Sequence, residues 1–122
     1  MQALVVDDSA IIRKILTAYL QRFGFTVTVA EDGRQALDRL STMPTSDLVL
    51  VDWNMPEMDG IAFIRAVRAQ AHYAALPLIM VTTNSDISHV AEALDAGANE
   101  YIMKPFTADI MREKLELLGF AV

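Results

Sequence analysis

Five side chains that could do chemistry together each follow a short apolar run of the chain. They are three carboxylates, one hydroxyl and one ammonium, and they belong to Asp7, Asp8, Asp52, Thr82 and Lys104. Three carboxylates held close together raise each other's pKa unless a cation joins them. Mg²⁺ is the hard cation that takes oxygen ligands from a small cluster and keeps several waters. The set therefore predicts a Mg²⁺ site, whereas Ca²⁺ would need more protein oxygens and no cluster of His or Cys indicates zinc.

A carboxylate beside Mg²⁺, an ammonium and a hydroxyl can receive a phosphoryl group. Asp52 would attack phosphorus in line, while Mg²⁺ and Lys104 would offset charge on the equatorial oxygens. Thr82 would donate a hydrogen bond to one of those oxygens. Aspartyl phosphates occur as covalent intermediates in other proteins. The product is labile, which suits a signal of limited lifetime.

Each of these residues also has a plain structural interpretation. Asp7 and Asp8 could cap the helix that follows them, because Asp is a favoured N-cap. Asp52 could simply begin a turn, and Lys104 taken alone would be a solvated lysine. The functional interpretation depends on the five residues occurring together. Residues that only cap helices or begin turns would not be expected to place these types after four different strands.

Five apolar runs rich in Val, Ile and Leu are predicted as strands. They cover residues 3–6, 25–30, 48–51, 77–81 and 101–103. Runs without alternating polar residues are typical of strands that are buried on both faces. Parallel strands of this kind bind ligands beyond their carboxyl ends, which is where the five candidate residues lie.

Amphipathic stretches between the runs are predicted as helices. Their inward stripes comprise Ile12, Ile15, Leu16, Tyr19, Leu20 and Phe23; Phe63, Ile64 and Val67; Ile87, Val90, Ala91 and Leu94; and Met111, Leu115 and Leu118. Asp32, Asp59 and Thr107 are the expected N-caps of three helices. Five β/α units call for a parallel sheet with helices on both faces.

The composition bounds the class of protein. The chain has 122 residues, a net charge of -6 and no cysteine, and 53% of its residues are hydrophobic. We expect one domain spanning residues 1–122. The negative charge argues against nucleic acid and anionic membranes as partners, and the apolar stretches are far shorter than a membrane span. The absence of cysteine and of a basic leader fits a cytoplasmic protein.

Four segments of the chain resemble the receiver domain of two-component response regulators. They are residues 5–9 (VVDDS), 51–60 (VDWNMPEMDG), 81–82 (VT) and 104–106 (KPF). The likeness runs from the first predicted strand to the last helix and is closest to the stand-alone CheY-type chemotaxis regulators. It implies a flavodoxin-like (βα)5 fold, a doubly wound parallel five-stranded sheet with strand order 2-1-3-4-5. That order comes from the family and not from the sequence pattern.

The resemblance also implies the residues that bind the cofactor, Mg²⁺. Asp52 is implied as the phosphoacceptor and, with Asp7 and Asp8, as a metal ligand. Asp8 would bind the ion directly and Asp7 mostly through water. The backbone carbonyl of Asn54 would be the remaining protein ligand.

A switch and its partners follow from the same resemblance. Thr82 and Lys104 would contact the phosphoryl group, and Tyr101 would change rotamer together with Thr82. The bond between Lys104 and Pro105 would be cis. The donor would be a sensor histidine kinase, and a downstream target would read the face formed by the fourth helix, the fifth strand and the fifth helix. The protein would catalyse only its own phosphorylation and dephosphorylation, and it would be a monomer when unphosphorylated.

Two asparagines are expected to tune the hydrolysis of the phosphate. Asn54 and Asn84 occupy positions that flank the path of the hydrolytic water in this family. Asn84 departs from the acidic residue found there in the best-known member. We therefore do not expect a comparably fast self-hydrolysis.

The fourth predicted helix also departs from that member. Asp86, His89 and Glu92 make it less basic, which argues against assuming the flagellar motor as the partner. His89 is expected on a solvated helical face. Chemotaxis is accordingly one candidate process and not a conclusion from the residues.

Three other interpretations stay open at this stage. A haloacid dehalogenase-type phosphatase also uses an aspartyl phosphate, but its nucleophile usually ends the first strand and a second Asp follows two residues later, where this chain has Asn54. A degenerate receiver acting as a constitutive binding module would lack an acceptor or a metal ligand, and none is missing. The chain could also be the receiver portion of a larger regulator. The five glycines form no phosphate loop or dinucleotide fingerprint.

Overall fold

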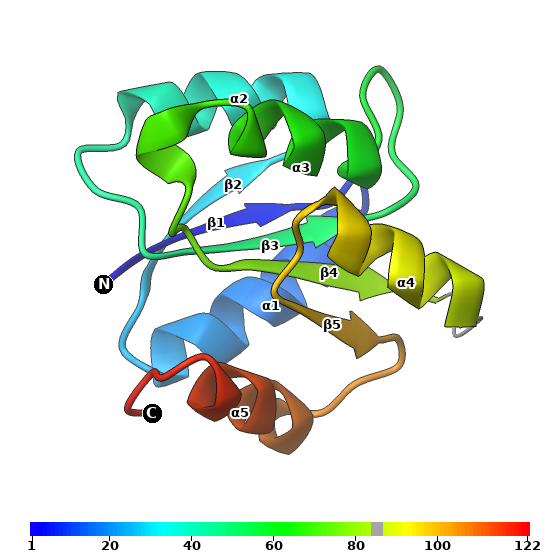
Figure 1. The fold of residues 1–122 in the computed structure, drawn as a ribbon. Coiled ribbons are helices and arrows are strands. Elements are labelled where there is room, and N and C mark those ends of the chain that lie inside the picture. The colour runs from blue at the N-terminus through cyan, green and yellow to red at the C-terminus, as the bar shows by residue number, and fades with distance from the viewer. Residues whose placement is uncertain (84–86) are drawn as a thin grey trace.

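A five-stranded parallel sheet runs through the computed structural model of the chain, which describes residues 1–83 and 87–122. The strands are β1 (Gln2–Val6), β2 (Thr26–Ala30), β3 (Leu48–Asp52), β4 (Leu78–Thr82) and β5 (Glu100–Met103). They lie in the order β2-β1-β3-β4-β5, which confirms the predicted order (Figure 1). The three inner strands are buried along nearly their whole length because helices cover both faces.

Helices pack on the two faces of the sheet. They are α1 (Ala10–Arg22), α2 (Gly33–Thr42), α3 (Gly60–Arg68), α4 (Ile87–Ala96) and α5 (Ala108–Leu117), with a short 3₁₀ helix, η1 (Ala71–Tyr73), before β4. Figure 1 shows α1 and α5 on one face and α2, α3 and α4 on the other. An apolar cluster fills each interface. Within the described residues, no helix is both long and apolar enough to cross a membrane.

Side chains cap several helices where the sequence predicts. Asp32, Asp59 and Thr107 each accept a hydrogen bond from the backbone N–H three residues on, at 2.8, 2.8 and 3.2 Å. Helix α1 differs, because Ser9 is its N-cap and accepts the equivalent bond at 3.3 Å. The interpretation that the two preceding aspartates merely cap this helix is therefore wrong.

Helix α4 turns a different side inward from the one predicted. The predicted stripe places Ala91 and Leu94 inside, yet Ala91 is exposed and Leu94 is 45% exposed. Ala93 and Ala96 are buried instead. Helix α4 packs against α3 and beside the edge strand β5, where small side chains let a helix approach closely. Hydrophobicity alone therefore selects the wrong side of this helix.

Arg68, at the end of α3, joins three parts of the fold near the start of β4. Its Nε donates to the Gly97 carbonyl at 3.0 Å, and its Nη1 donates to the Tyr73 carbonyl at 2.8 Å. Its Nη2 donates to Oδ1 of Asn99 at 2.8 Å, and the same oxygen accepts from the N–H of Leu78 at 2.8 Å. The guanidinium thus ties α3, η1 and the loop before β5 to one another.

Replacing Arg68 should cost more stability than replacing a neighbour of the same type. We expect Arg68→Met to lower the free energy of unfolding by about 2 to 4 kcal/mol, because several partly buried acceptors lose their donor. Arg65 is exposed on the same helix, so Arg65→Met should cost less than about 0.5 kcal/mol. Urea unfolding of the two variants measures the difference, and equal losses would contradict this role for Arg68.

Candidate functional site

The parallel register brings the carboxyl ends of β1, β3 and β4 side by side, at the end of the sheet where the strands finish; below, this end is called the carboxyl edge of the sheet. Asp7 follows β1 directly and Asp52 is the last residue of β3, and the residues before them are register partners. Asp52 in turn pairs with Val81, the residue before Thr82. Figure 1 shows these strands pointing toward the same edge. The chain segments that carry the predicted site residues therefore end next to each other.

Three carboxylates meet at this edge. One oxygen from each of Asp7, Asp8 and Asp52 lies within 4.8 Å of the other two. Asp7 and Asp52 are buried, with 1% and 8% of their surface exposed, whereas Asp8 is exposed. A hard divalent cation such as Mg²⁺ fits this donor set, because it takes carboxylate oxygens and keeps waters on the open side. The arrangement supports the predicted metal ligands.

Lys104 lies between two of the carboxylates. Its Nζ is 3.1 Å from Oδ2 of Asp7 and 3.3 Å from Oδ1 of Asp52. The peptide bond between Lys104 and Pro105 is cis, as the family resemblance implies. The ammonium is mostly shielded from solvent, so its attraction to the two carboxylates is weakly screened. It is positioned beside any group that becomes attached to Asp52.

Asp7 is held by two further contacts that the sequence did not reveal. Its Oδ1 accepts from the N–H of Ser9 at 2.9 Å, and its carbonyl accepts from Nη1 of Arg13 at 2.7 Å. Both partners lie at or near the start of α1, the helix that follows the aspartates. The sequence predicts that a helix begins soon after Asp7. It does not predict that Arg13 of this helix bonds back to the Asp7 carbonyl.

The pKa of Asp52 is raised from its ordinary value of 3.8 to about 6. Burial is the largest cause, and repulsion from Asp7 comes next. Attraction and hydrogen bonding to Lys104 lower this pKa, while the charge of Asp8 raises it. The carboxylate of Asp52 is therefore largely ionised at neutral pH, at a free-energy cost that an added cation would reduce.

Thr82 and the two predicted asparagines, Asn54 and Asn84, are placed differently by the structure. Thr82 ends β4 and is buried, with 2% of its surface exposed. Asn54 is exposed in the loop after β3, two residues beyond Asp52. Asn84 and Asp86 lie outside the described residues. The structure therefore brings Thr82 and Asn54 to the same edge as the carboxylates and leaves the role of Asn84 a prediction.

Tyr101 lies apart from the carboxylate cluster. It is in β5, where it pairs in register with Met80 of β4, and it is half-buried. Nζ of Lys114 in α5 is 4.6 Å from the centre of the Tyr101 ring and 2.9 Å from Oε1 of Glu100. The ring is thus held by a cation on the edge strand, which pairs with β4, the strand that Thr82 ends.

Two contacts fix the segment that follows Asp52. The Trp53 carbonyl accepts from the N–H of Gly60 at 2.8 Å, and a Cβ on Gly60 would overlap the Asp52 carbonyl. The Trp53 ring packs edge-on against His89 of α4, with ring centres 5.1 Å apart and planes at 70°. His89 is half-buried in this contact, so the expectation that it lies on a solvated helical face is wrong.

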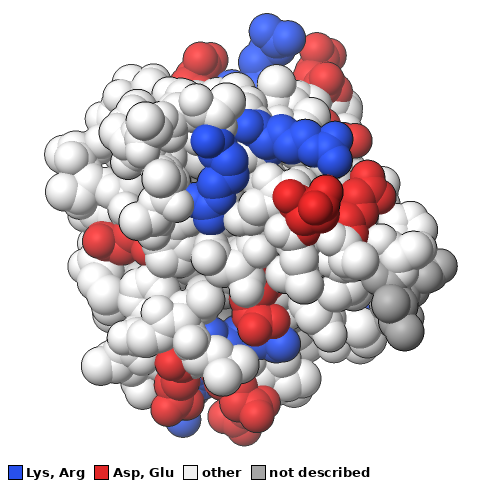
Figure 2. All heavy atoms as spheres, in the orientation of Figure 1, with Lys and Arg blue, Asp and Glu red and all other residues white. Residues whose placement is uncertain are grey.

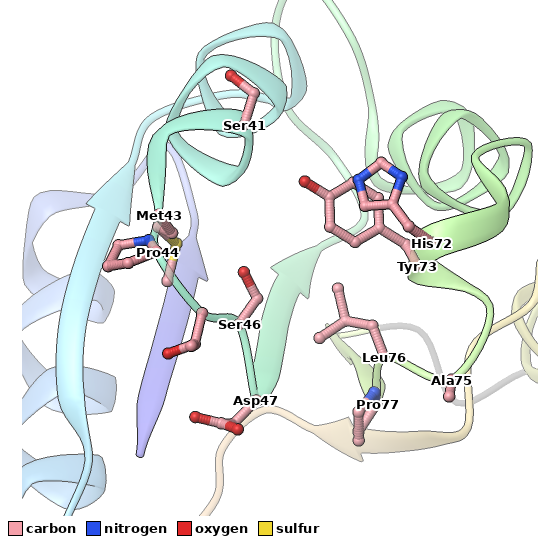
Figure 3. A pocket seen from close by; sticks show the side chains of 11 residues that line it. Ser41, Met43, Pro44, Ser46, Asp47, His72, Tyr73, Ala75, Leu76 and Pro77 are labelled. Atoms are coloured by element: carbon pink, nitrogen blue, oxygen red, sulfur yellow. The ribbon is translucent and has the colours of Figure 1, made fainter.

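A hollow of about 530 Å³ opens at the other end of the sheet, where β3 and β4 begin (Figure 3). It lies between the loop from α2 to β3 and the segment from η1 to β4. Asp47, the one carboxylate among its lining residues, accepts from the N–H of Gln2 at 2.7 Å. The hydroxyl of Tyr73 donates to the Leu40 carbonyl at 3.3 Å. These polar groups hold loops together, and none of the three clustered aspartates lines the hollow.

Comparison with known proteins agrees with this geometry. The family profile of the response regulator receiver domain matches residues 3–116. Chemotaxis protein CheY1 of Helicobacter pylori (strain ATCC 700392 / 26695) is 41% identical over 119 residues, which cover 97% of this chain and 96% of that protein. The chemotaxis protein CheY homolog of Campylobacter jejuni subsp. jejuni serotype O:23/36 (strain 81-176) is 45% identical over 117 residues, which cover 95% and 90%. The solved structure of chemotaxis response regulator CheY4 of Vibrio cholerae has a TM-score of 0.89 at 35% identity, and the match covers 96% of this chain and 97% of that one.

A methyl group on Gly60 should disturb the segment after Asp52. We expect Gly60→Ala to lower the free energy of unfolding by about 2 to 4 kcal/mol, because the added Cβ meets backbone that cannot move aside easily. The emission of Trp53, the single tryptophan, should shift as well. Gly119→Ala is the control: Gly119 has a φ of +93° but open space around its Cβ position, so it should cost only about 1 kcal/mol and leave the emission unchanged. An unshifted Gly60→Ala spectrum would count against this constraint.

The raised pKa of Asp52 predicts a pH-dependent stability. Below pH 3.8 the carboxyl is protonated in both folded and unfolded protein, and as pH rises toward 6 only the unfolded chain gives up its proton, so stability falls. In EDTA at pH 7.5, we therefore expect Asp52→Asn to be more stable than the wild type by about 1 to 3 kcal/mol. The gain should shrink as pH falls and vanish near pH 4.

Urea unfolding across this pH range measures the effect. Asp38→Asn, which removes an exposed carboxylate on α2, should show no comparable gain. A gain at Asp52 that is constant with pH, or no gain at pH 7.5, would contradict the electrostatic origin.

Proposed function

Because this chain belongs to the response regulator receiver domain family, we propose that Asp52 accepts a phosphoryl group and that the protein passes this signal on through its surface. The domain is of the CheY type, whose family acts in two-component signal transduction. The observation that carries the site assignment is the meeting of Asp7, Asp8 and Asp52 beside Lys104 at one edge of the sheet. Chemotaxis is the process we propose, since the relatives are named as chemotaxis proteins.

The chain's own side chains would divide the work of phosphoryl transfer. An oxygen of Asp52 forms the new bond to phosphorus as the bond from phosphorus to the donor's histidine nitrogen breaks. Lys104, already beside the carboxylates, offsets charge on one phosphoryl oxygen, and the hydroxyl of Thr82 donates to another. The three carboxylates and the carbonyl of Asn54 would hold Mg²⁺, whose positive charge would offset the charge of the acids and of the phosphoryl oxygens.

Phosphorylation would change the positions of the Thr82 and Tyr101 side chains. A hydroxyl drawn toward the phosphoryl group vacates space, and an aromatic ring can rotate into it. Phosphate then favours one of two packings and shifts a population that already exists. Rotation of Tyr101 would also change its contact with the ammonium of Lys114 at the outer edge of the sheet. This supports the face formed by α4, β5 and α5 as the one that a target reads.

The phosphodonor we propose is a sensor histidine kinase. An apolar hollow of about 320 Å³ adjoins Lys104, and Ile12, Ile15 and Phe106 are among its lining residues. A donor protein that covers this hollow would bring its phosphohistidine to the carboxylates and exclude water. Nucleic acid is not among the proposed partners, because the net charge is -6. We place the protein in the cytoplasm, as a single receiver domain over residues 1–122 that is monomeric before phosphorylation.

The receiver family does not consist of conventional enzymes. We propose that the chain promotes only its own phosphorylation and dephosphorylation, with Asn54 and Asn84 setting the phosphate lifetime. A haloacid dehalogenase-type phosphatase fits less well, because the candidate nucleophile ends the third strand of the chain and position 54 is not acidic. Multiple turnover on a phosphate ester would favour that alternative.

Trp53 reports on this proposal, because it adjoins Asp52 and is the single tryptophan. We expect its fluorescence to change with Mg²⁺ at a concentration on the order of millimolar, since open Mg²⁺ sites bind weakly. A second change should follow when beryllofluoride, a phosphoryl mimic, is added. Asp52→Asn should lose this second response, because the mimic needs the carboxylate oxygen.

The matched control is Asp38→Asn, which removes an exposed carboxylate remote from the site and should keep both responses. Mass spectrometry after incubation with acetyl phosphate should find one added phosphoryl group in the wild type and none on Asp52→Asn. If Asp52→Asn keeps the beryllofluoride response, another residue is the acceptor.

A further inference from the structure

Strand β2 is the outermost strand on the side of the sheet away from β5 (Figure 1). It pairs in register with β1 over its five residues, Thr26–Ala30, and no bulge interrupts the pairing. Its sequence, TVTVA, contains no charged residue and no proline, which are devices that protect many edge strands from pairing with another chain. The outer side of β2 is therefore suited to receive a further strand.

Hydrogen bonds at the two ends of β2 show which of its residues face outward. Thr26 donates to the residue before β1 at 2.8 Å, and Ala30 accepts from the residue after β1 at 3.1 Å. Because alternate residues of a strand turn their N–H and C=O to opposite sides, Val27 and Val29 turn theirs away from β1. Nε of Arg39 in α2 donates to the Val29 carbonyl at 3.1 Å, which agrees with this direction. Among the described residues, the N–H of Val29 and both backbone groups of Val27 are left for another strand.

A groove of about 390 Å³ lies beside these backbone groups, between α1 and β2. Lys14, Ala18 and Gln21 are among the residues that line it from α1. Val29 lines it from β2, and 40% of the surface of this valine is exposed. A strand added to β2 would place every second side chain on the face of the sheet where the groove lies.

The charges beside β2 on this face are positive. Helix α1 carries Arg13, Lys14 and Arg22 and no acid. Arg13 and Lys14 line the groove, which has no carboxylate among its lining residues. Oε1 of Glu31 lies 3.9 Å from Nη2 of Arg13, whereas no carboxylate of the described residues forms an ion pair with the exposed Lys14. The ammonium of Lys14 is therefore available to a carboxylate of another chain.

The opposite side of the sheet carries the opposite charge. Figure 2 shows red side chains over α4 and α5. Arg112 and Lys114 are the bases of these two helices, and their acids are Glu92, Asp95, Asp109, Glu113 and Glu116. An acidic partner is therefore repelled from α4 and α5 and attracted to α1 and β2.

We propose that the outward backbone of Val27 and Val29, together with the groove between α1 and β2, binds an extended segment of a partner protein that carries acidic and apolar side chains. This site is here called the β2 edge surface. The segment would add a strand to the sheet, and its side chains over the groove would cover Val29 and bring carboxylates to Arg13 and Lys14. The inference does not depend on the proposed function, because the β2 edge surface lies across the sheet from the face formed by α4, β5 and α5.

Charge and backbone geometry separate this occupant from others. A second copy that paired through its own β2 would bring the bases of one α1 against those of the other, which is unfavourable. A second copy that offered its acidic α4 or α5 would present a helix, which cannot continue the ladder of a sheet. Nucleic acid has no peptide groups to pair with Val27 and Val29, and it meets a net charge of -6. An acidic extended segment satisfies both the cations and the backbone.

A pair of short capped peptides tests this inference. Both alternate threonine on one side of an extended chain with other residues on the second side. In the glutamate peptide the second side carries valine between glutamates, and in the lysine peptide lysine replaces each glutamate. We expect the glutamate peptide to bind at least about tenfold more tightly than the lysine peptide at low salt, with a difference that shrinks as salt rises. Isothermal titration calorimetry measures both affinities, and equal binding or no binding of the glutamate peptide would overturn the inference.

Hydrogen exchange identifies the mode of binding. In the free protein, the amides of Val27 and Val29 should exchange faster than the amide of Thr28, which faces β1. A saturating glutamate peptide should slow exchange at Val27 and Val29 by at least about tenfold. N-methylation of one alternate set of peptide amides should abolish binding, and methylation of the other set should alter it less than about twofold, because only one set faces β2. Unchanged exchange at both valines, or equal effects of the two methylated sets, would show that the segment adds no strand.

Matched variants separate the β2 edge surface from the rest of the protein. Lys14→Glu should weaken the glutamate peptide about tenfold, whereas Arg65→Glu makes the same change in charge at an exposed site on α3 and should weaken it less than about twofold. Val29→Gln should weaken it as well, and Leu94→Gln, at a site on α4 that is 45% exposed, should not. Equal effects within either pair would contradict the site, as would a dimer of the free chain that protects the amides of Val27 and Val29.

Discussion

The repulsion among three carboxylates is the constraint on which the site depends. Asp7, Asp8 and Asp52 place oxygens within 4.8 Å of one another, and two of these residues are buried. Within the described residues, Lys104 places its ammonium beside them, with Nζ 3.1 Å from Oδ2 of Asp7 and 3.3 Å from Oδ1 of Asp52. Burial and then the charge of Asp7 raise the pKa of Asp52 by more than Lys104 lowers it. A site with this remaining negative charge favours a divalent cation. In the proposed reaction one oxygen of Asp52 then bonds to phosphorus, so that the carboxylate becomes an acyl phosphate.

The rest of the fold holds that unfavourable arrangement in place. The register of β1, β3 and β4 sets the positions of the strand ends, and apolar clusters on both faces of the sheet keep the strands together. Short contacts then fix the loops: Ser9 and Arg13 hold Asp7, and Gly60 holds the Trp53 carbonyl. Buried hydrophobic area thus supplies the free energy that keeps like charges close.

The edge strand β5 links this chemistry to the surface. Tyr101 lies in the same strand that leads into Lys104, and its ring contacts Lys114 of α5. Helix α4 reaches the site from the other side, through the packing of His89 on Trp53. Contacts therefore connect the surroundings of Asp52 to α4 through Trp53 and to α5 through β5. A phosphoryl group can act on a distant partner only by favouring one of two such packings.

The sequence by itself determined the five parallel strands, most of the helix caps, and the identity of the candidate site, because strand ends and N-caps are local patterns and parallel strands share one ligand edge. The strand order came from family resemblance, since periodicity carries no information on which strands are neighbours. Only the tertiary structure decided which side of α4 is buried, that His89 packs on Trp53, and that Arg13 reaches back to Asp7. The first two features depend on contacts between segments that are far apart in the chain. The third depends on which of several nearby acceptors the arginine side chain bonds to. Such contacts are established only when the helices pack against the sheet.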